Sequence, residues 1–258
     1  MNLIRKVFDL NFENKVVVVT GGSQGIGKAI CKGFAGKGAK VSILDIKEEE
    51  TQKVVDEIKK DGGTAKFYKT NVMDSSSVKE TFGKILKEFE YIDILVNNAG
   101  IVNTKPYEDV TESEYDLVMG VNLKSVFNTT KIVFPLMKKR RSGKIVNIAS
   151  VAGKRGGGIL GNTIYAASKA GVIGLTKGLA REGGPYGINV NAVCPGPTET
   201  PMLKEFKGER RNNFLNTIPL RKFGKPEGVA NMVMFLASDL AEFITGEISD
   251  VDEGIMMD

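Results

Sequence analysis

A tyrosine and a lysine stand four residues apart in the segment NTIYAASKAG, at Tyr165 and Lys169, in a chain that contains no histidine. The segment reads as a helix, and side chains four positions apart on a helix share one face. A phenol with an ordinary pKa of about 10 is too weak a base at neutral pH, but a neighbouring ammonium stabilises the phenolate and lowers that pKa. The pair could therefore act as the general acid and base of an enzyme without histidine. Because the same spacing arises by chance in many helices, the pair needs support from other residues.

A glycine-rich segment, TGGSQGIG at residues 20–27, follows a run of β-branched residues near the start of the chain. Gly21, Gly25 and Gly27 have the spacing G-x-x-x-G-x-G. Without Cβ atoms the backbone can turn tightly and approach a pyrophosphate, which binds at the N-terminus of the following helix. Glycines also make purely structural turns between a strand and a helix. The position directly after the first buried strand favours a dinucleotide site.

Asp45 indicates which dinucleotide is bound. It ends the second strand-like segment, about 20 residues beyond the glycines, where a carboxylate accepts hydrogen bonds from a ribose 2′-hydroxyl and repels a 2′-phosphate. Gln24 precedes Gly25, so no arginine stands there to neutralise such a phosphate, and Lys28 and Lys47 have ordinary places on helix surfaces. The sequence therefore predicts NAD(H) over NADP(H). The alternative role for Asp45 is to cap the next helix.

Strand-like and helical segments alternate along the whole chain. The strand-like segments are residues 15–22, 39–45, 65–70, 92–98, 143–150, 188–196 and 246–251. The helical segments are residues 25–37, 48–60, 75–89, 112–139, 163–183 and 226–237. This alternation predicts an α/β fold, a single doubly wound Rossmann-type domain over residues 1–258, with a parallel seven-stranded sheet and helices on both faces. Residues 197–225 contain no strand pattern and several prolines, which predicts a substrate lid.

Polar and glycine residues follow several of the predicted strands. Ser150 ends the fifth strand, Asn98 to Gly100 end the fourth, and Cys194-Pro195-Gly196 end the sixth. Ligands of open α/β sheets bind outside the carboxyl ends of the strands, so these residues should meet in one crevice.

Composition excludes several classes of function. The net charge of +5 comes from scattered basic residues, and the dense run KKRR at 138–141 closes a helix whose dipole it complements, so we expect no nucleic-acid partner. No apolar run is long enough for a membrane span, and residues 1–11 lack the features of a signal peptide, so we expect a cytoplasmic protein. Two cysteines, Cys31 and Cys194, define neither a disulfide framework nor a metal site, and no metal is predicted.

Together these motifs resemble those of the short-chain dehydrogenase/reductase superfamily, in order and over nearly the whole chain. The resemblance implies a catalytic tetrad of Asn122, Ser150, Tyr165 and Lys169. Tyr165 would exchange a proton with the substrate oxygen, which Ser150 would also hydrogen-bond. Lys169 would bind the cofactor ribose and lower the pKa of Tyr165, while Asn122 would hold a water of a proton relay.

The resemblance also implies the residues that contact NAD. These are Gly21, Ser23, Gln24, Gly25, Ile26, Gly27, Asp45, Ile46, Asn71, Val72, Asn98, Ala99, Gly100, Tyr165, Lys169, Pro195, Gly196, Thr198 and Thr200. Within that set Asn71 and Val72 would contact the adenine, and Thr198 and Thr200 the nicotinamide carboxamide. A homotetramer is implied as well, with the helices at 112–139 and 163–183 packed between subunits.

Three departures from the family pattern are visible. Asn71 stands where an aspartate is usual, and Glu253 interrupts an ending that is usually richer in glycine. Ser150 and Tyr165 are 15 positions apart, about two more than the resemblance leads us to expect. The extra length falls in GKRGGGILGN, which should border the substrate pocket.

The leading hypothesis is an oxidoreductase that interconverts a secondary alcohol and a ketone by hydride transfer, with a sugar acid, a polyol or another small hydroxy compound as substrate. The basic residues of the lid region would suit an anion or form a solvated surface: Arg155, Lys204, Lys207, Arg210, Arg211, Arg221 and Lys222. The alternatives are a 3-oxoacyl-(acyl-carrier-protein) reductase and a hydroxysteroid dehydrogenase, the latter with Met202, Leu203, Phe206 and Phe214 around its substrate. A catalytically silent nicotinamide-nucleotide sensor is the non-enzyme alternative.

Overall fold

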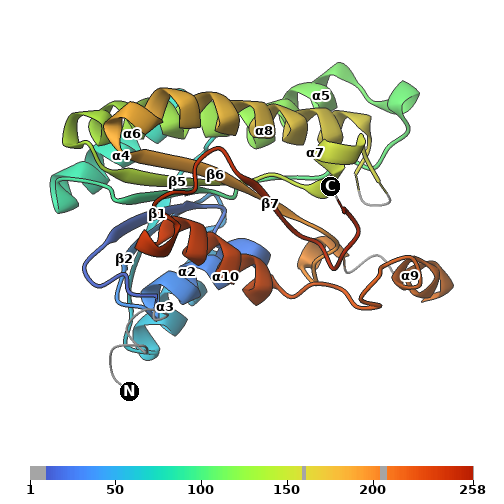
Figure 1. Ribbon diagram of the computed structural model, residues 1–258, viewed down its shortest axis with the longest axis horizontal. Helices are drawn as coiled ribbons and strands as arrows, with labels where there is room; N and C mark the ends of the chain where they lie inside the picture. The colour runs from blue at the N-terminus through green and yellow to red at the C-terminus, as the bar shows by residue number, and fades with distance from the viewer. Residues whose placement is uncertain (1–9, 159–160, 204–207, 258) are drawn as a thin grey trace.

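A computed structural model of the chain describes residues 10–158, 161–203 and 208–257. Seven parallel strands form one sheet in the order β3-β2-β1-β4-β5-β6-β7, as the alternating pattern predicts (Figure 1). The strands are β1 (Val16–Thr20), β2 (Lys40–Asp45), β3 (Thr64–Lys69), β4 (Ile94–Asn97), β5 (Gly143–Ile148), β6 (Ile188–Pro195) and β7 (Ile248–Val251).

Helices cover both faces of the sheet (Figure 1). One face carries α2 (Gly25–Ala35), α3 (Glu48–Lys60) and α10 (Pro226–Ala237). The other carries α4 (Ser75–Phe89), α6 (Ser125–Arg140) and α8 (Thr163–Gly183). The strand order reverses between β1 and β4, and a crevice for ligands opens at such a switch point.

The run of valines in β1 is explained by burial on both faces. Val17 and Val19 pack into the core beneath α2, α3 and α10, whereas Val16 and Val18 pack into the core beneath α4, α6 and α8. A strand that is covered on both sides has no solvent-facing position for a polar residue. The same burial fixes β1 at the centre of the sheet and places the glycine-rich segment at its carboxyl end.

The long predicted helix at 112–139 is interrupted. It consists of α5 (Glu112–Met119), a π-helical turn at Gly120–Lys124 and α6, so Asn122 lies on the π turn rather than on a regular helix. Single π turns inside α-helices are frequent at functional sites, because they shift side chains out of the regular register.

Several short elements have no counterpart in the sequence prediction. These are α7 (Val151–Arg155), α9 (Gly208–Leu215) and the 3-10 turns Tyr107–Asp109, Gly184–Tyr186, Pro201–Leu203 and Asp239–Ala241. Both cysteines are buried and free. None of the helices in the described ranges has the length and apolar character needed to cross a membrane.

Candidate active site

A cleft of about 1390 Å³ opens at the carboxyl ends of the strands. Among its lining residues are all the predicted site residues except Asn122, which lies buried behind it. The cleft also includes parts of α5 and α7, the start of the lid and the C-terminal tail. The structure therefore brings together residues from every region that the sequence motifs marked.

The glycine-rich turn is fitted tightly against the end of β4. Gly21 has φ of 69°, and a Cβ there would lie 2.8 Å from Ala99 Cα, while a Cβ on Gly27 would lie 2.1 Å from the Gly21 carbonyl oxygen. Asn98 Nδ2 donates to the carbonyl oxygens of Thr20 and Gly21 at 3.0 and 2.8 Å. Only glycine fits at these two positions.

The start of α2 is suited to an anion. Its N-cap residue, Gln24, makes no side-chain cap, and no acidic residue occupies the first turn. The N–H groups of that turn therefore face no competing carboxylate at the positive end of the helix dipole. This arrangement, beside a backbone stripped of Cβ atoms, fits the pyrophosphate of a dinucleotide.

Asp45 is buried and organises the neighbouring loop. Its Oδ2 accepts from the Ser23 backbone N–H and its Oδ1 from that of Lys47, each at 3.0 Å. The N-cap of α3 is Lys47, so Asp45 does not cap that helix. An ionised carboxylate can accept about four hydrogen bonds, so two remain for ribose hydroxyls.

The four residues of the implied tetrad come from three places in the fold: Asn122 from the π turn, Ser150 from the N-cap of α7, and both Tyr165 and Lys169 from α8. Ser150 caps α7 by accepting from the Ala152 N–H at 3.1 Å. Lys169 is buried on α8, and its Nζ donates to the Ile148 carbonyl at 2.8 Å and lies 6.0 Å from the centre of the Tyr165 ring.

Asn122 is held from both sides. Its Oδ1 accepts from the Ile101 N–H at 2.8 Å, and its Nδ2 donates to the Ile101 carbonyl and to Ser168 Oγ, each at 2.9 Å. A Cβ on Gly100 would lie 3.4 Å from Asn122 Oδ1 and 3.3 Å from Lys169 Nζ, so Gly100 lies between the two side chains. A side chain at this position would therefore press slightly on the Lys169 ammonium.

Burial dominates the ionisation of the pair in the protein alone. Desolvation raises the pKa of Tyr165 above its ordinary value, although a hydrogen bond with Ser150 opposes this. Desolvation also lowers the pKa of Lys169 to about 8. In the protein alone the pKa of Tyr165 is therefore raised, and not lowered as expected from the neighbouring Lys169, because burial disfavours the charged phenolate. A positive charge inside the cleft would act in the opposite direction.

The remainder of the cleft is largely apolar. α5, the π turn after it, α7, the lid and the C-terminal tail contribute apolar lining residues, namely Leu117, Val121, Val151, Met202, Leu203, Phe214, Pro219, Ile255 and Met257. Met202, Leu203 and Phe214 belong to the apolar set expected from the lid, whereas the tail residues Ile255 and Met257 carry no sequence signal. Phe206 lies outside the described residues.

The basic residues of the lid region are not gathered in the cleft. Arg155 borders it, but Arg211 lies on a separate cavity and pairs with Glu199 at 3.2 Å. Lys204, Lys207 and the Arg210 side chain lie outside the described residues. Of the basic residues that were expected to bind an anion, Arg155 is the one that the described part of the structure places at the cleft.

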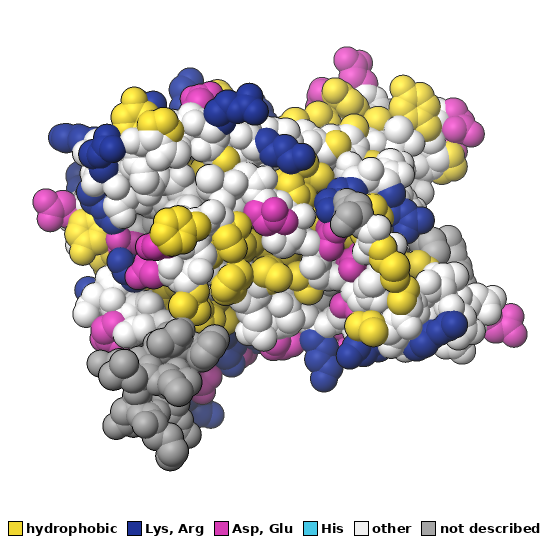
Figure 2. Space-filling view, viewed as in Figure 1, with side chains coloured by type: hydrophobic (Ala, Val, Ile, Leu, Met, Phe, Trp, Pro, Cys, Tyr) yellow, Lys and Arg dark blue, Asp and Glu magenta, His cyan; other side chains and the backbone are white. Residues whose placement is uncertain are grey.

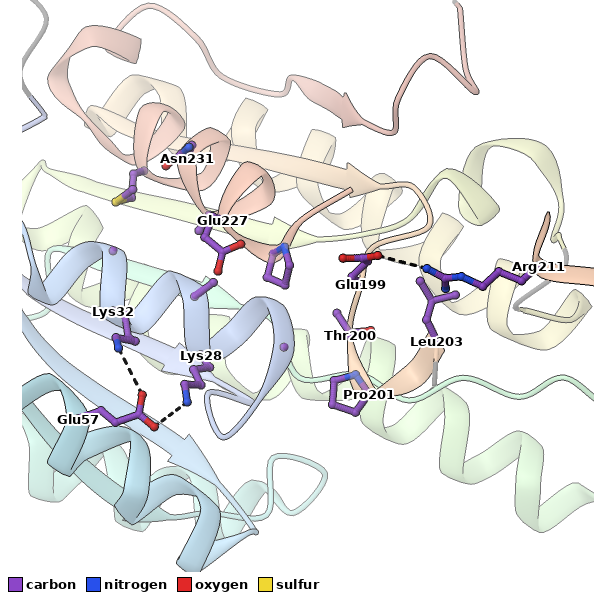
Figure 3. Close-up of a pocket in the computed structure, with 16 residues that line it drawn as sticks. Lys28, Lys32, Glu57, Glu199, Thr200, Pro201, Leu203, Arg211, Glu227 and Asn231 are labelled. Carbon is purple, nitrogen blue, oxygen red and sulfur yellow. Dashed lines mark hydrogen bonds and ion pairs between the residues drawn. The ribbon is translucent and has the colours of Figure 1, made fainter. Parts of the chain in front are cut away.

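That separate cavity, of about 870 Å³, lies between α2, α10 and the start of the lid (Figure 3). On its wall Glu57 pairs with Lys28 at 2.8 Å and with Lys32 at 3.3 Å. Lys28 is thereby engaged away from the position of a 2′-phosphate, whereas Lys47 borders the cleft beside Asp45.

Comparison with known proteins agrees with this geometry. The family model described as enoyl-(acyl carrier protein) reductase matches residues 21–256. The chain belongs to the short-chain dehydrogenase/reductase superfamily. It is an oxidoreductase that acts on CH–OH groups with a nicotinamide cofactor.

Two curated relatives align with this dehydrogenase/reductase over almost its whole length. It is 44% identical to the 3-oxoacyl-(acyl-carrier-protein) reductase FabG of Thermotoga maritima, over 96% of this chain and 100% of that one. It is 42% identical to the enzyme of the same name from Escherichia coli K12, with the same coverage.

Solved structures agree in fold. Levodione reductase superposes with a TM-score of 0.90 at 34% identity, over 95% of this chain and 98% of that one. A putative 2-deoxy-D-gluconate 3-dehydrogenase from Agrobacterium tumefaciens, with bound NADP, superposes with a TM-score of 0.86 at 35% identity and the same coverage.

Proposed function

We propose that this enzyme reduces the 3-oxo group of an acyl thioester to the 3-hydroxyacyl form, with NADH as the reductant. The observation that carries the proposal is the apolar half of the cleft, bounded by the lid and the C-terminal tail beside Tyr165. A hydrocarbon chain gains free energy by leaving water for such a lining, whereas a polyol would lose hydrogen bonds there. The names of the curated relatives point to the same substrate class. This choice replaces the sugar acid or polyol that the sequence alone favoured.

The reaction needs one hydride and one proton. The cofactor, when bound, would supply the hydride to the carbonyl carbon. Tyr165 donates its phenolic proton to the carbonyl oxygen, and Ser150 donates a hydrogen bond to the same oxygen. Lys169 would bind the ribose hydroxyls of the cofactor, and its buried ammonium, with a pKa of about 8, could pass on a proton near neutral pH. Asn122 holds a water that connects Lys169 to solvent.

The preference for NADH rests on Asp45. Its carboxylate is fixed by two backbone N–H groups and still has acceptor capacity for the ribose 2′-hydroxyl. A 2′-phosphate in that place would meet a buried negative charge. Lys28, the nearest base on α2, is engaged with Glu57.

A sugar-acid dehydrogenase is the second candidate, and Arg155 is the observation that favours it. This exposed arginine borders the cleft and has no ion-pair partner among the described residues. A guanidinium binds a carboxylate in a bidentate manner, so it could hold the acid group of a small substrate.

A substrate panel tests both candidates. N-acetylcysteamine thioesters of 3-oxo acids from four to twelve carbons, sugar acids, polyols and hydroxysteroids are assayed with NAD(H) and NADP(H) in parallel. We expect the highest kcat/KM for a medium-chain 3-oxoacyl thioester with NADH. Turnover of sugar acids alone would replace the proposal with the second candidate, and a clear preference for NADPH would contradict the role of Asp45. No turnover with any compound would favour a nucleotide sensor.

A further inference from the structure

The two ends of the lid meet in a short paired segment, which we call the lid stem and define as residues 196–199 together with Gly224. Thr198 and Gly224 form a parallel bridge. The Gly224 N–H donates to the Pro197 carbonyl at 3.0 Å, and the Glu199 N–H donates to the Gly224 carbonyl at 2.8 Å. Figure 3 shows Glu199 and Thr200 where the lid leaves this stem, opposite α2. Any movement of the stem therefore moves one wall of the cleft.

The lid stem is seated on the turn that follows β7. The Gly196 N–H donates to the Val251 carbonyl at 2.9 Å, and a Cβ on Gly196 would lie 2.7 Å from Asp252 Cα. Within the lid, the Leu220 N–H donates to the Glu253 carbonyl at 3.2 Å. The turn after β7 thus supports both the first and the last part of the lid.

The Glu253 side chain lies in this seat. A Cβ on Gly224 would be only 2.5 Å from Glu253 Oε1, so the carboxyl group packs directly against the stem backbone. Its other oxygen, Oε2, is buried and has no hydrogen-bond partner among the described residues. Glu253 also holds φ of 61°, a conformation that favours glycine. A charged carboxylate with a buried unpaired oxygen is costly, whereas a neutral carboxyl costs far less.

We propose that Glu253 is a protonation-dependent latch, whose neutral carboxyl group stays packed on Gly224 and holds the lid stem, and whose ionised form releases it. The latch acts on the cleft in which the proposed reaction takes place. The proposal rests on the proposed function only for the identity of the substrate that the lid covers.

The charges around Glu253 agree with this role. Burial and the neighbouring Asp252 raise the pKa of Glu253 to about 7, against the opposing effects of Lys222 on the lid and of the Gly224 backbone hydrogen bond. An acid whose pKa is raised in the docked state favours docking most below its ordinary pKa of 4.5 and loses that contribution as the pH rises to about 7. Acidification should therefore tighten the lid stem.

Amide hydrogen exchange measures the latch without any substrate. Protection of the Glu199, Leu220 and Gly224 amides is compared at pH 5 and pH 7.5 after correction for intrinsic exchange. We expect the wild type to lose more than tenfold protection at these amides between the two pH values, with core amides of β1 unchanged. Glu253→Gln keeps the size of the side chain and should remove the difference, whereas Glu247→Gln, an exposed carboxylate just before β7, should behave like the wild type. An equal pH effect in Glu253→Gln, or none in the wild type, would overturn the latch.

Steady-state kinetics supply a second readout. In the wild type KM for the acyl thioester should rise more than threefold between pH 5.5 and 7.5, and in Glu253→Gln and Glu253→Gly this rise should disappear, with the kcat profile unchanged. Glu253→Gly relieves the backbone strain and guards against misfolding of the glutamine variant. If amide protection depends on pH as expected but acyl thioesters are not turned over, the proposed function is contradicted and the latch is supported. If acyl thioesters are turned over but neither KM nor amide exchange depends on pH, the latch is contradicted and the proposed function is supported.

Discussion

Tyr165 is the residue whose chemistry depends most on what surrounds it. Burial raises the pKa of its phenol, so the hydroxyl carries its proton at neutral pH and is ready to donate it to a carbonyl oxygen. In the alcohol-oxidising direction it must act as a base, and the positive charge of an oxidised nicotinamide would then favour the phenolate. The same side chain can therefore serve both directions.

Tyr165→Phe should remove this proton transfer and leave the cleft intact. We expect kcat to fall by about 10²–10⁴-fold, while the dissociation constant for NADH, measured by fluorescence titration, changes less than threefold. Tyr115→Phe, on the exposed surface of α5, is the control and should keep full activity. Near-normal turnover in Tyr165→Phe would refute the acid–base role.

Asp45→Ala tests the choice of cofactor at the level of one carboxylate. The change removes the negative charge and frees the Ser23 and Lys47 N–H groups, which could then donate to a 2′-phosphate. We expect the ratio of kcat/KM for NADH to that for NADPH to fall by a factor of 100 or more, about 3 kcal/mol. Steady-state kinetics with both cofactors measure the ratio, and an unchanged ratio would rule out the carboxylate as the discriminating group.

At the scale of elements, the start of α8 determines where Tyr165 lies. Asn162 caps the helix by accepting from the Tyr165 N–H at 2.9 Å, and its Nδ2 donates to Asn103 Oδ1 and the Lys105 carbonyl, each at 3.0 Å. One side chain thus joins the catalytic helix to the loop that follows β4. Such a residue is a positioning residue, because it acts through the backbone of Tyr165.

Asn162→Ala should therefore reduce both stability and activity. We expect a loss of about 1–2 kcal/mol in the free energy of unfolding, measured by urea denaturation, and a greater loss in kcat than in cofactor affinity. Thr163→Ala, at the exposed next position, is the control. If the two variants are equally active and stable, Asn162 does not position the helix.

The elements themselves differ in how far the sequence predicts them. The central strands were predictable because a strand that is buried on both faces, such as β1 or β6, has a continuous run of apolar residues in the sequence. Glycines of the following turns mark where these strands end. The π turn at Asn122 was not predictable, because its residues fit a regular helix equally well and only the backbone hydrogen bonding, such as that from the Ser125 N–H to the Gly120 carbonyl, distinguishes it. Likewise α7 is too short to show a helical period.

At the scale of the whole molecule, the cleft is assembled from segments far apart in the chain. The cofactor half follows from motifs that each sit at the end of a strand, so its residues could be predicted from the sequence. The substrate half could be predicted only in part: Phe214 belongs to the apolar set expected from the lid, whereas Leu117 and Ile255 join it only through tertiary packing and have no special spacing. Substrate identity is for this reason the part of the function that needs experiment.

The stability of the whole molecule should carry the cost of burying Lys169. Its pKa falls to about 8 from the ordinary 10.5, so the folded protein binds fewer protons than the unfolded chain between these values, and stability rises with pH across that window. Relative to Lys169→Met, the wild type should gain about 3 kcal/mol from pH 8 to 10.5. Urea denaturation without cofactor at several pH values measures the difference, and parallel curves for the two proteins would contradict it.

The last prediction concerns the association of this chain with further copies of itself. On α6, which the family resemblance places between subunits, Phe127 and Leu136 are about half and two-fifths exposed. Figure 2 shows further hydrophobic side chains across the face that carries α10 and β7, and Phe235, Leu240 and Phe243 are exposed in that part of the chain. We expect the wild type to sediment as a tetramer, and Phe127→Asp to reduce its mass because a charge would be buried between subunits. Tyr107→Asp, exposed outside this helix face, should not. A monomeric wild type, or a Phe127→Asp variant of unchanged mass, would show that α6 does not form the contact.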